Sequence, residues 1–277
     1  MQLEIEHLTL TYGTRTALED LTATLSGNLI GVLGANASGK TSLLQILAGT
    51  AAPSAGRVVI DGEAIRPGRR PGISYLPQET GFFPFWQKPA ETLSATFLLK
   101  GMPGRDPTAL LASLGLEQED RSAAEFSGGM KQKMRIVQAL AHAPKVLILD
   151  EPTTGLDLRE RHRLLHLIER LRDRVTVIFS THHPEDAAAV CDALLILHRG
   201  RAVAAGKPNE IRALATGRVF ELTVDSPTLP TGGEYEVVHV ERDDGKLQIR
   251  AVSTAPLVAP NVPPRLEDAY ILLTRAG

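Results

Sequence analysis

The amino-acid sequence predicts an α/β protein with a mainly parallel sheet, followed by a small α+β unit. Short segments such as 146–149 and 194–197 are apolar throughout and alternate with helical segments, which is typical of a parallel sheet covered on both faces. A glycine-rich turn joins an apolar strand at 29–33 to a helix at 41–47. Beyond about residue 215 the segments alternate between apolar and polar residues, which indicates a separate antiparallel sheet.

Composition and charge narrow the class of protein. With 277 residues, 43% of them hydrophobic and 22% charged, the chain can bury a full-sized core, which excludes disordered and fibrous classes. The 30 basic and 32 acidic residues nearly cancel, so no nucleic-acid partner is expected. The single cysteine, Cys191, cannot form an internal disulfide, which suits a reducing cytosol.

No segment of the sequence is typical of a membrane span or an export signal. The apolar runs at 146–149 and 193–197 are far shorter than the roughly 18 to 20 residues that cross a bilayer. The start of the chain carries Glu4 and Glu6, where a signal peptide would have basic residues and an unbroken apolar stretch. We therefore expect a cytoplasmic protein that does not itself span a membrane.

The first half of the chain is expected to contain strands and a helical region. The apolar residues at positions 3, 5 and 8 predict an edge strand, and the helix at 41–47 carries leucines on one face. A strand at 57–60 ends in an Asp61-Gly62 turn. After a strand at 73–76, residues 79–125 are expected to be mainly helical, with a break at 101–107.

In the second half the strand–helix alternation returns and then stops. We predict strands at 146–149, 176–180 and 194–197 with helices at 158–172 and 184–191, then strands at 219–224, 234–241 and 246–252 and a helix at 265–274. The expected division is a main α/β domain over 1–212, with a helical subdomain at about 79–140, and an α+β extension over 213–277. The boundary lies somewhere between 205 and 218.

A phosphate-binding loop lies between the strand at 29–33 and the helix that follows. The segment matches the G-x-x-x-x-G-K-[ST] pattern in full, in the strand–loop–helix context that the pattern requires. Backbone N–H groups and the helix N-terminus would face a polyphosphate, Lys40 would neutralise β and γ oxygens, and the Thr41 hydroxyl would bind Mg²⁺. The expected nucleotide-binding residues here are Gly34, Ala35, Asn36, Ala37, Ser38, Gly39, Lys40, Thr41 and Ser42.

Two carboxylates follow the buried strand at 146–149. Asp150 and Glu151 would lie at the edge of the parallel sheet where ligands bind. Asp150 is expected to hold Mg²⁺, usually through water, and Glu151 to polarise the attacking water as a general base. The alternative to a catalytic role is that these two residues form a solvated acidic turn. This alternative is disfavoured because the sequence also contains the phosphate loop.

A second helix N-terminus that could bind an anion lies between the phosphate loop and Asp150-Glu151. Ser127-Gly128-Gly129 opens a helical stretch, with Ser127 as a natural cap. One phosphate loop does not need two such sites, which favours a dimer in which the second site closes on a nucleotide held by the other subunit. The chain here resembles the nucleotide-binding subunit of ATP-binding cassette (ABC) transporters, whose signature is LSGGQ; Phe126 and Met130 depart from that form.

The resemblance extends over roughly residues 2–210 and implies roles for four more residues. Tyr12 matches the aromatic residue that stacks on adenine, although the residue alone favours an ordinary edge-strand tyrosine. Gln78 matches the glutamine that contacts Mg²⁺ or the lytic water. Asp157, in Gly-Leu-Asp, matches the loop that crosses the dimer seam. His182, in Ser-Thr-His, matches the switch histidine that senses the γ-phosphate, although a lone histidine is more often structural.

The resemblance implies an ATPase that works as a head-to-tail pair of subunits. ATP and Mg²⁺ are the implied ligands; Lys40, Gln78, Glu151 and His182 are the implied catalytic residues, and Thr41, Gln78 and Asp150 the implied metal ligands. The partner is a second copy or a paralogue, together with separate transmembrane permease subunits on the cytoplasmic face of the membrane. An importer subunit, or a soluble cassette ATPase acting on nucleic acid or ribosomes, is the alternative.

Two further patterns bear on the type of transporter. The segment 264–270, Pro-Arg-Leu-Glu-Asp-Ala-Tyr, is similar to the P-x-LED-x-F ending of the drug-resistance (ABC-2-type) and polysaccharide-type exporter branch, with Tyr270 in place of Phe. This similarity favours export, although an ordinary capped amphipathic helix is the alternative. Aromatic residues are scarce, yet four cluster just after Gln78. Concentrated aromatics usually mark an interface, although a small satellite core is the alternative. The hypothetical permease-docking residues are Phe82, Phe83, Phe85 and Trp86.

Overall fold

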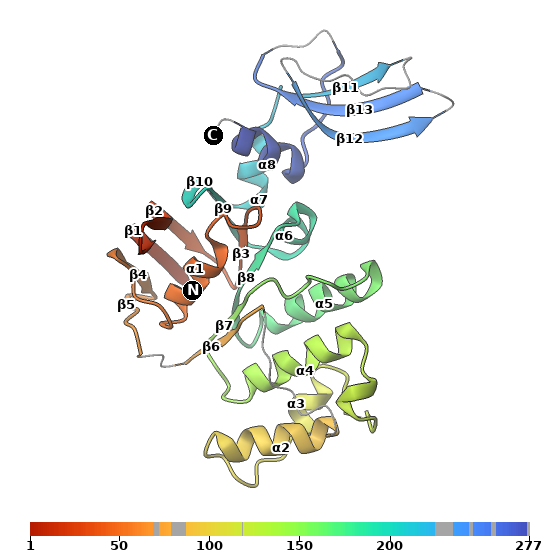
Figure 1. Ribbon diagram of the computed structural model, residues 1–277. Helices are drawn as coiled ribbons and strands as arrows, with labels where there is room; N and C mark the ends of the chain where they lie inside the picture. Colours follow the sequence, from red (N-terminus) through yellow and green to blue (C-terminus); the bar gives the residue numbers. More distant parts are fainter. Residues whose placement is uncertain are drawn as a thin grey trace.

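The computed structural model describes residues 1–68, 72–78, 87–117, 119–224, 235–243, 246–255 and 259–275. Its centre is a six-stranded sheet in the order β10-β9-β3-β8-β7-β6 (Figure 1). All neighbouring pairs are parallel except β10 with β9, and the predicted α/β architecture is confirmed. The strands are β3 (Leu29–Leu33), β6 (Ile73–Leu76), β7 (Val146–Leu149), β8 (Thr176–Thr181), β9 (Ala193–His198) and β10 (Arg201–Gly206).

The unbroken apolar sequence of the central strands follows from burial on both faces. In β7, Leu147 and Leu149 join one hydrophobic cluster, while Val146 and Ile148 join another on the opposite face. Successive side chains of a strand point to opposite sides, so both sides of β7 must be apolar. The first cluster contains helix residues from α2 to α5, and the second contains α1 and the N-terminal strands.

A four-stranded antiparallel sheet in the order β2-β1-β4-β5 covers the second cluster. It consists of β1 (Gln2–Tyr12), β2 (Arg15–Ser26), β4 (Ala55–Ile60) and β5 (Glu63–Ala64). The prediction that residues 3, 5 and 8 form an edge strand is wrong. β1 pairs with β2 on one side and β4 on the other, and the alternation of its apolar residues reflects one buried face rather than an edge position.

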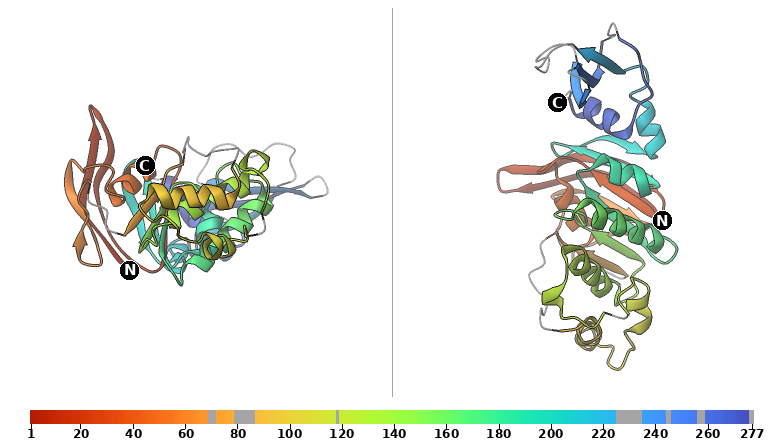
Figure 2. Two further views of the ribbon diagram at one scale, coloured as in Figure 1. Left: turned by 90° about the horizontal axis from the view of Figure 1, so that it is seen from below. Right: turned by 90° about the vertical axis from the view of Figure 1, so that its right-hand side faces the viewer.

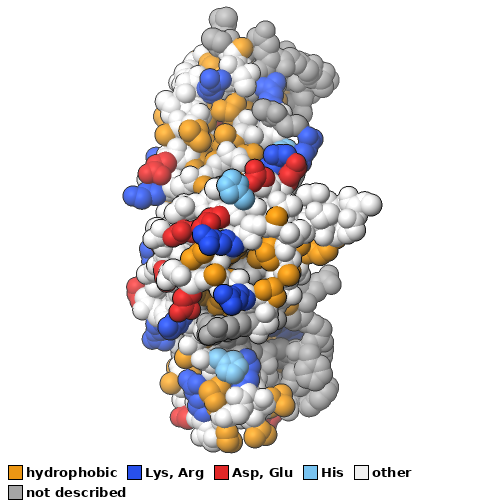
Figure 3. All heavy atoms as spheres, turned by 90° about the vertical axis from the view of Figure 1, so that its left-hand side faces the viewer, with side chains coloured by type: hydrophobic (Ala, Val, Ile, Leu, Met, Phe, Trp, Pro, Cys, Tyr) orange, Lys and Arg blue, Asp and Glu red, His pale blue; other side chains and the backbone are white. Residues whose placement is uncertain are grey.

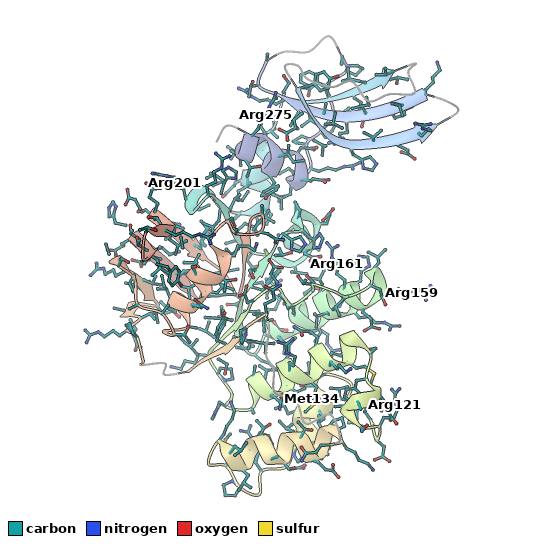
Figure 4. The ribbon with its side chains drawn as sticks, in the orientation of Figure 1. Arg121, Met134, Arg159, Arg161, Arg201 and Arg275 are labelled. Atoms are coloured by element: carbon teal, nitrogen blue, oxygen red, sulfur yellow. The ribbon has the colours of Figure 1, made fainter. Side chains whose placement is uncertain are left out.

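Eight α-helices and one short 3-10 helix occur in the described residues. The predicted helical region is made of α2, α3 and α4, and Met134 of α4 is fully buried in the cluster beneath them (Figure 4). The helices are α1 (Lys40–Leu47), α2 (Pro89–Leu99), α3 (Thr108–Ala112), η1 (Ala123–Glu125), α4 (Gly128–Leu140), α5 (Leu158–Leu171), α6 (Pro184–Val190), α7 (Pro208–Ala213) and α8 (Leu266–Arg275).

The C-terminal part of the chain forms the predicted small antiparallel sheet, in the order β11-β13-β12. Its strands are β11 (Val219–Val224), β12 (Tyr235–Asp243) and β13 (Lys246–Ser253). This sheet and the α2–α4 region lie at opposite ends of the molecule, and α8 lies between this sheet and the part of the molecule that contains the six-stranded sheet (Figures 1 and 2). The molecule is therefore elongated, with the central sheet in the middle.

The distribution of charge on the surface and the length and apolar character of the helices are relevant to membrane contact. On the face shown in Figure 3, basic and acidic side chains are intermixed rather than separated by sign. Among the described residues, no helix has both the length and the apolar character needed to pass through a bilayer.

Candidate active site

Three neighbouring strands bring the predicted site residues to one edge of the central sheet. β3, β8 and β7 are parallel neighbours, with Leu33 paired to Thr181 and Leu149 paired to Phe179. The phosphate loop, His182 and Glu151 follow the ends of these strands and therefore meet at their carboxyl edge, where α/β proteins bind ligands.

A cavity of about 1000 Å³ lies at this edge. Ten predicted residues line it, and the remaining lining residues come from β2, the loop after Asp150-Glu151 and the β9–β10 turn. The lining residues are Tyr12, Arg15, Thr16, Ala17, Asn36, Ala37, Gly39, Lys40, Thr41, Ser42, Gln78, Glu151, Thr154, His182, Arg199 and Gly200. No pattern in the sequence pointed to the six positions 15–17, 154, 199 and 200.

The phosphate loop requires glycine at two positions for different reasons. Gly39 caps α1 in the left-handed region with φ 106°, and a Cβ there would lie 2.7 Å from the Ala17 carbonyl oxygen. A Cβ on Gly34 would lie 2.4 Å from Ser38 Oγ. The loop therefore closes tightly only because neither residue has a side chain.

Lys40 is held by three oxygen atoms. Its Nζ donates to the carbonyl oxygens of Gly34 at 2.9 Å and Ala35 at 3.0 Å, and lies 3.0 Å from Glu151 Oε1. The Lys40 side chain is 4% exposed. The ammonium group and the Glu151 carboxylate thus neutralise each other at the edge of the cavity.

Glu151 is an ionised carboxylate at the centre of the site. Burial raises its pKa, but the Thr154 hydroxyl, the Lys40 ammonium and His182 together outweigh burial and lower it. The His182 Nδ1 lies 3.3 Å from Glu151 Oε2 without meeting hydrogen-bond geometry, so this is a close electrostatic contact rather than a hydrogen bond. A carboxylate with a lowered pKa is in the protonation state that a general base requires.

Asp150 is buried behind Glu151 and does not line the cavity. It is 2% exposed; its Oδ1 accepts from Ser180 Oγ at 2.6 Å and its Oδ2 from the Tyr75 hydroxyl at 3.4 Å. Ser180 also accepts from the Glu151 N–H at 2.8 Å, so one serine orients both acidic residues. Burial, and then the charge of Asp150, raise the pKa of Tyr75, which stays a neutral donor. Neither Tyr75 nor Ser180 was predicted as a site residue.

The turn that contains His182 is held in place by the buried carboxylate of Asp186. Asp186, in the first turn of α6, is 1% exposed. Its carboxylate accepts from Thr153 Oγ1 at 2.9 Å and from Arg161 Nε at 2.6 Å (Figure 4). The Thr153 side chain comes from the loop after Glu151, so the two loops on either side of the site are fixed to each other through Asp186.

Tyr12 and Gln78 lie at the outer part of the cavity. The Tyr12 ring is 50% exposed and its hydroxyl donates to Gln45 Oε1 at 3.4 Å, so a flat face is open to a ligand. The carbonyl oxygen of Gln78 accepts from Arg135 Nη2 of α4 at 3.1 Å. The predicted docking residues Phe82, Phe83, Phe85 and Trp86 lie outside the described residues.

The signature residues lie apart from the cavity of their own chain. Ser127 caps α4 as predicted, accepting from the Met130 N–H at 3.2 Å, and Asp157 caps α5, accepting from the Glu160 N–H at 2.9 Å. A Cβ on Gly129 would lie 2.1 Å from Glu160 Oε2, so the two helix starts are packed closely together. None of the residues Ser127, Gly128, Gly129 and Asp157 is among those lining the cavity.

Comparison with known proteins decides the family. A family model described as ABC transporter matches residues 18–154. The Nod factor export ATP-binding protein I of Rhizobium etli is 31% identical over 98% of this chain and 93% of its own length. The chain belongs to the ABC transporter family.

Other relatives extend this result. The spermidine/putrescine import ATP-binding protein PotA of Protochlamydia amoebophila is 33% identical over 74% of this chain and 58% of its own length. An ATP-binding cassette of an ABC transporter in its ADP conformation is 23% identical, with a TM-score of 0.68 over 76% of this chain and 92% of its own. The fold is therefore that of the ABC cassette, and the chain is an ATPase that hydrolyses ATP to ADP and phosphate. Since export and import proteins both match, the relatives leave the direction of transport open.

The residues of this ABC ATPase suit a polyphosphate and a magnesium ion. The Ser38 hydroxyl is buried without a hydrogen-bond partner, beside the loop that would hold the phosphates. Thr41 and Gln78 offer hydroxyl and amide oxygens at the cavity, and the buried Asp150 carboxylate would hold the ion through water; oxygen atoms are the ligands that Mg²⁺ prefers. Among the described residues, no cluster of three or more His, Cys, Asp or Glu occurs.

Proposed function

We propose that this ABC ATPase drives export through separate transmembrane subunits. The meeting of Lys40, Glu151 and His182 at one cavity supports the catalytic part of the proposal. Two observations favour export: the Nod factor export relative aligns over nearly the whole chain, and the segment 264–270 is similar to the exporter ending. Import is the second candidate, because an import protein is also 33% identical.

In the proposed reaction the chain positions ATP and stabilises charge. Residues 34–42 bind the phosphates through backbone N–H groups, and Tyr12 stacks on the adenine. Lys40 leaves the carbonyl oxygens of the loop for the β and γ oxygens, which frees Glu151 to accept a proton from the attacking water. His182 donates to the γ-phosphate. Mg²⁺, held by Thr41, Asp150 and Gln78, would supply neutralisation of phosphate charge.

We propose that two copies pair head to tail when ATP binds. The starts of α4 and α5 carry Ser127 to Gly129 and Asp157 away from the cavity of their own chain. A helix N-terminus with free N–H groups attracts anions, so this surface suits the nucleotide of a partner copy. Bound ATP would then complete the interface, and hydrolysis would weaken it.

The remaining parts of the proposal concern location and domain division. The subunit would act at the cytoplasmic face of the membrane, attached to the permease, with docking near 82–86. Residues 1–212 would form the nucleotide-binding domain, with the helical subdomain at about 79–140, and 213–277 the extension. The separate hydrophobic cluster of β11–β13, containing Leu247, Ile249 and Ala251, supports that division.

The replacement Glu151→Gln tests the catalytic assignment. The amide cannot accept the proton of water, so kcat should fall by roughly 100-fold to 10,000-fold. ATP should still bind, and closed dimers should accumulate in sedimentation experiments with ATP. Hydrolysis at the wild-type rate would remove Glu151 from the role of general base.

The direction of transport needs a membrane assay. The chain would be copurified with its polytopic partner and placed in vesicles with the cassettes outward, together with ATP and a small-molecule extract of the host cells. Enrichment of a compound inside, relative to Glu151→Gln vesicles, is expected for an exporter. Loss of a preloaded compound from the vesicles would instead indicate import. Stimulation of the ATPase by RNA or DNA would favour a role on nucleic acid.

A further inference from the structure

One oxygen of the buried Asp186 carboxylate joins the two loops that carry the proposed catalytic residues. Asp186 Oδ2 accepts from Thr153 Oγ1 at 2.9 Å and, at a longer 3.4 Å, from Thr181 Oγ1. Thr153 is two residues beyond Glu151 in the chain, and Thr181 directly precedes His182. Asp186 is 1% exposed, so bulk water does not reach the carboxylate.

The other oxygen of Asp186 binds a residue in the first part of α5. Arg161 Nε donates to Asp186 Oδ1 at 2.6 Å, and this ion pair is largely shielded because the Arg161 side chain is 17% exposed. The N–H of Arg161 donates to the carbonyl oxygen of Asp157 at 2.9 Å. Asp186 therefore ties the two loops to the start of α5, which carries the proposed dimer residue Asp157.

The loop that contains Glu151 needs such support because its backbone is in an unfavourable conformation. Glu151 has φ 44°, in the left-handed region that residues with a side chain rarely adopt. A backbone of this kind keeps its shape only where surrounding contacts hold it. Two contacts act on Glu151 itself, from the Thr154 hydroxyl and to Ser180 Oγ. The hydrogen bond between Thr153 and Asp186 adds a third contact, from outside the loop.

The turn that contains His182 depends on the same carboxylate. The Thr181 hydroxyl accepts from the His183 N–H at 3.0 Å, and the Asp186 N–H donates to the His183 carbonyl oxygen at 3.2 Å. The His182 Nδ1 lies 3.3 Å from Glu151 Oε2 and has no hydrogen-bond partner in the described part of the chain. The two loops, rather than a direct bond, therefore determine how far His182 lies from Glu151.

We propose that Asp186 is a positioning residue for ATP hydrolysis, which sets the position of His182 relative to Glu151 by joining their two loops. The inference rests on the proposed roles of Glu151 and His182. Phosphoryl transfer depends mainly on positioning and charge, so a small displacement of a reacting group costs much of the rate. Asp186 is not among the residues that line the cavity, so its replacement should affect turnover more than ATP binding.

The replacement Asp186→Asn keeps the shape of the side chain but leaves one acceptor oxygen in place of two. Either the threonine hydroxyls or Arg161 must then lose a partner, and kcat should fall roughly 10- to 100-fold. The dissociation constant for ATP should stay within about 2-fold of the wild-type value, because the residues that bind the phosphates are unchanged. Calorimetry on the full chain gives the dissociation constant, and steady-state kinetics give kcat.

Asp268→Asn is the matched control, because Asp268 is also a buried aspartate paired with an arginine. It is fully buried in α8, and its Oδ1 accepts from Arg250 Nε at 2.9 Å. Its replacement should lower the melting temperature, as Asp186→Asn should, but should leave kcat within about 2-fold of wild type. Wild-type kcat in Asp186→Asn would overturn the inference, as would equal falls of kcat in the two variants.

Replacement of Arg161 tests the same network while Asp186 stays in place. Arg161→Met should lower kcat, and Arg161→Lys should restore part of it, because the lysine keeps a charged donor. If thermal unfolding shows that Asp186→Asn is not folded at the assay temperature, these two variants decide. Equal kcat values for wild type and Arg161→Met would then overturn the inference.

A double-mutant cycle tests whether Asp186 acts through His182. In the His182→Ala background, Asp186→Asn should lower kcat by a much smaller factor than it does in the wild-type chain. Full additivity would overturn the inference, because Asp186 would then act independently of His182. The parent variant separates the two possible failures. Wild-type turnover in His182→Ala would show that the proposed role of His182 is wrong, and the inference would fall with it. If His182→Ala is slow and Asp186→Asn is not, only the inference is wrong.

Discussion

At the scale of single residues, Glu267 lies in an unfavourable electrostatic position. Burial raises the pKa of its carboxyl, and the carboxylates of Glu185 and Asp268 raise it further, against the smaller opposing effects of His239 and Arg265. The folded state therefore binds this proton more tightly than the unfolded state. For a raised carboxyl pKa, the stabilising contribution is present at low pH and is lost as the pH rises through the folded pKa.

The upward shift of the Glu267 pKa predicts the effect of Glu267→Gln on stability. At pH 7.5 the substitution removes a carboxylate that faces two others, so the melting temperature should rise by about 1 to 2 °C after allowance for solvent screening. The difference should shrink as the pH falls toward the ordinary carboxyl value of 4.5. Thermal unfolding of wild type, Glu267→Gln and the exposed control Glu117→Gln between pH 8 and pH 4 measures this. A lower melting temperature at pH 7.5 would mean that attraction to His239 and Arg265 dominates.

At the same scale, sequence patterns point to the residues that we propose to react, but not to the residues that orient them. The phosphate loop and Glu151 could be predicted because glycine, lysine and a carboxylate occur at spacings that the chemistry demands. Tyr75 and Ser180 contact Asp150 across the sheet, and Arg161 contacts Asp186 from another helix. Such contacts depend on which strands and helices are neighbours, and no local spacing encodes that.

At the scale of elements, α4 connects the signature to the segment containing Gln78. Its first turn follows Ser127, and two turns later Arg135 donates to the carbonyl oxygens of Pro77 at 2.9 Å and Gln78 at 3.1 Å. Gln132 Oε1 accepts from Arg135 Nη1 at 2.9 Å and orients the guanidinium group. A displacement of α4 would therefore move the backbone of Gln78 at the edge of the cavity.

The replacement Arg135→Met should lower kcat while ATP affinity stays within about 2-fold, because the phosphate loop is untouched. Loss of two charged hydrogen bonds predicts a fall of roughly 10-fold or more. Arg135→Lys keeps a charged donor and should lie between wild type and Met. Arg66→Met, at an exposed arginine, is the control for the loss of a guanidinium. Equal kcat values for Arg135→Met and Arg66→Met would show that this connection has no role in turnover.

Strands that are buried on both faces could be predicted from the sequence. Strands and helices with one buried face were harder to predict. β3 and β7 have no exposed residue in their burial pattern, and an unbroken apolar run has no other simple explanation. The alternating pattern of β1 does not reveal how many neighbours a strand has, which is why its interior position in the antiparallel sheet was mispredicted. β10 and α7 were not singled out, because short amphipathic segments resemble connecting loops.

At the scale of the whole molecule, the proposed head-to-tail dimer makes ATP binding and dimerisation separable. In each site the cavity would belong to one subunit and the start of α4 to the other. A change at α4 should therefore spare ATP binding and block dimerisation. Gly128 suits this test, since a Cβ there would lie 3.5 Å from Leu156 Cδ2, an ordinary van der Waals contact. A side chain at this position therefore fits the monomer without displacing its neighbours.

We predict that Gly128→Asp, made in the Glu151→Gln background, binds ATP with an affinity within about 2-fold of its parent but dimerises at least 10-fold more weakly. The introduced carboxylate repels the γ-phosphate of the partner at a helix N-terminus that should attract it. Ala112→Asp adds the same charge on an exposed part of α3 and should leave dimerisation unchanged. Calorimetry gives the affinity, and sedimentation with ATP gives the dimer. If Gly128→Asp lost ATP binding and dimerisation together, the start of α4 would belong to the site of its own chain, and the head-to-tail arrangement would be wrong.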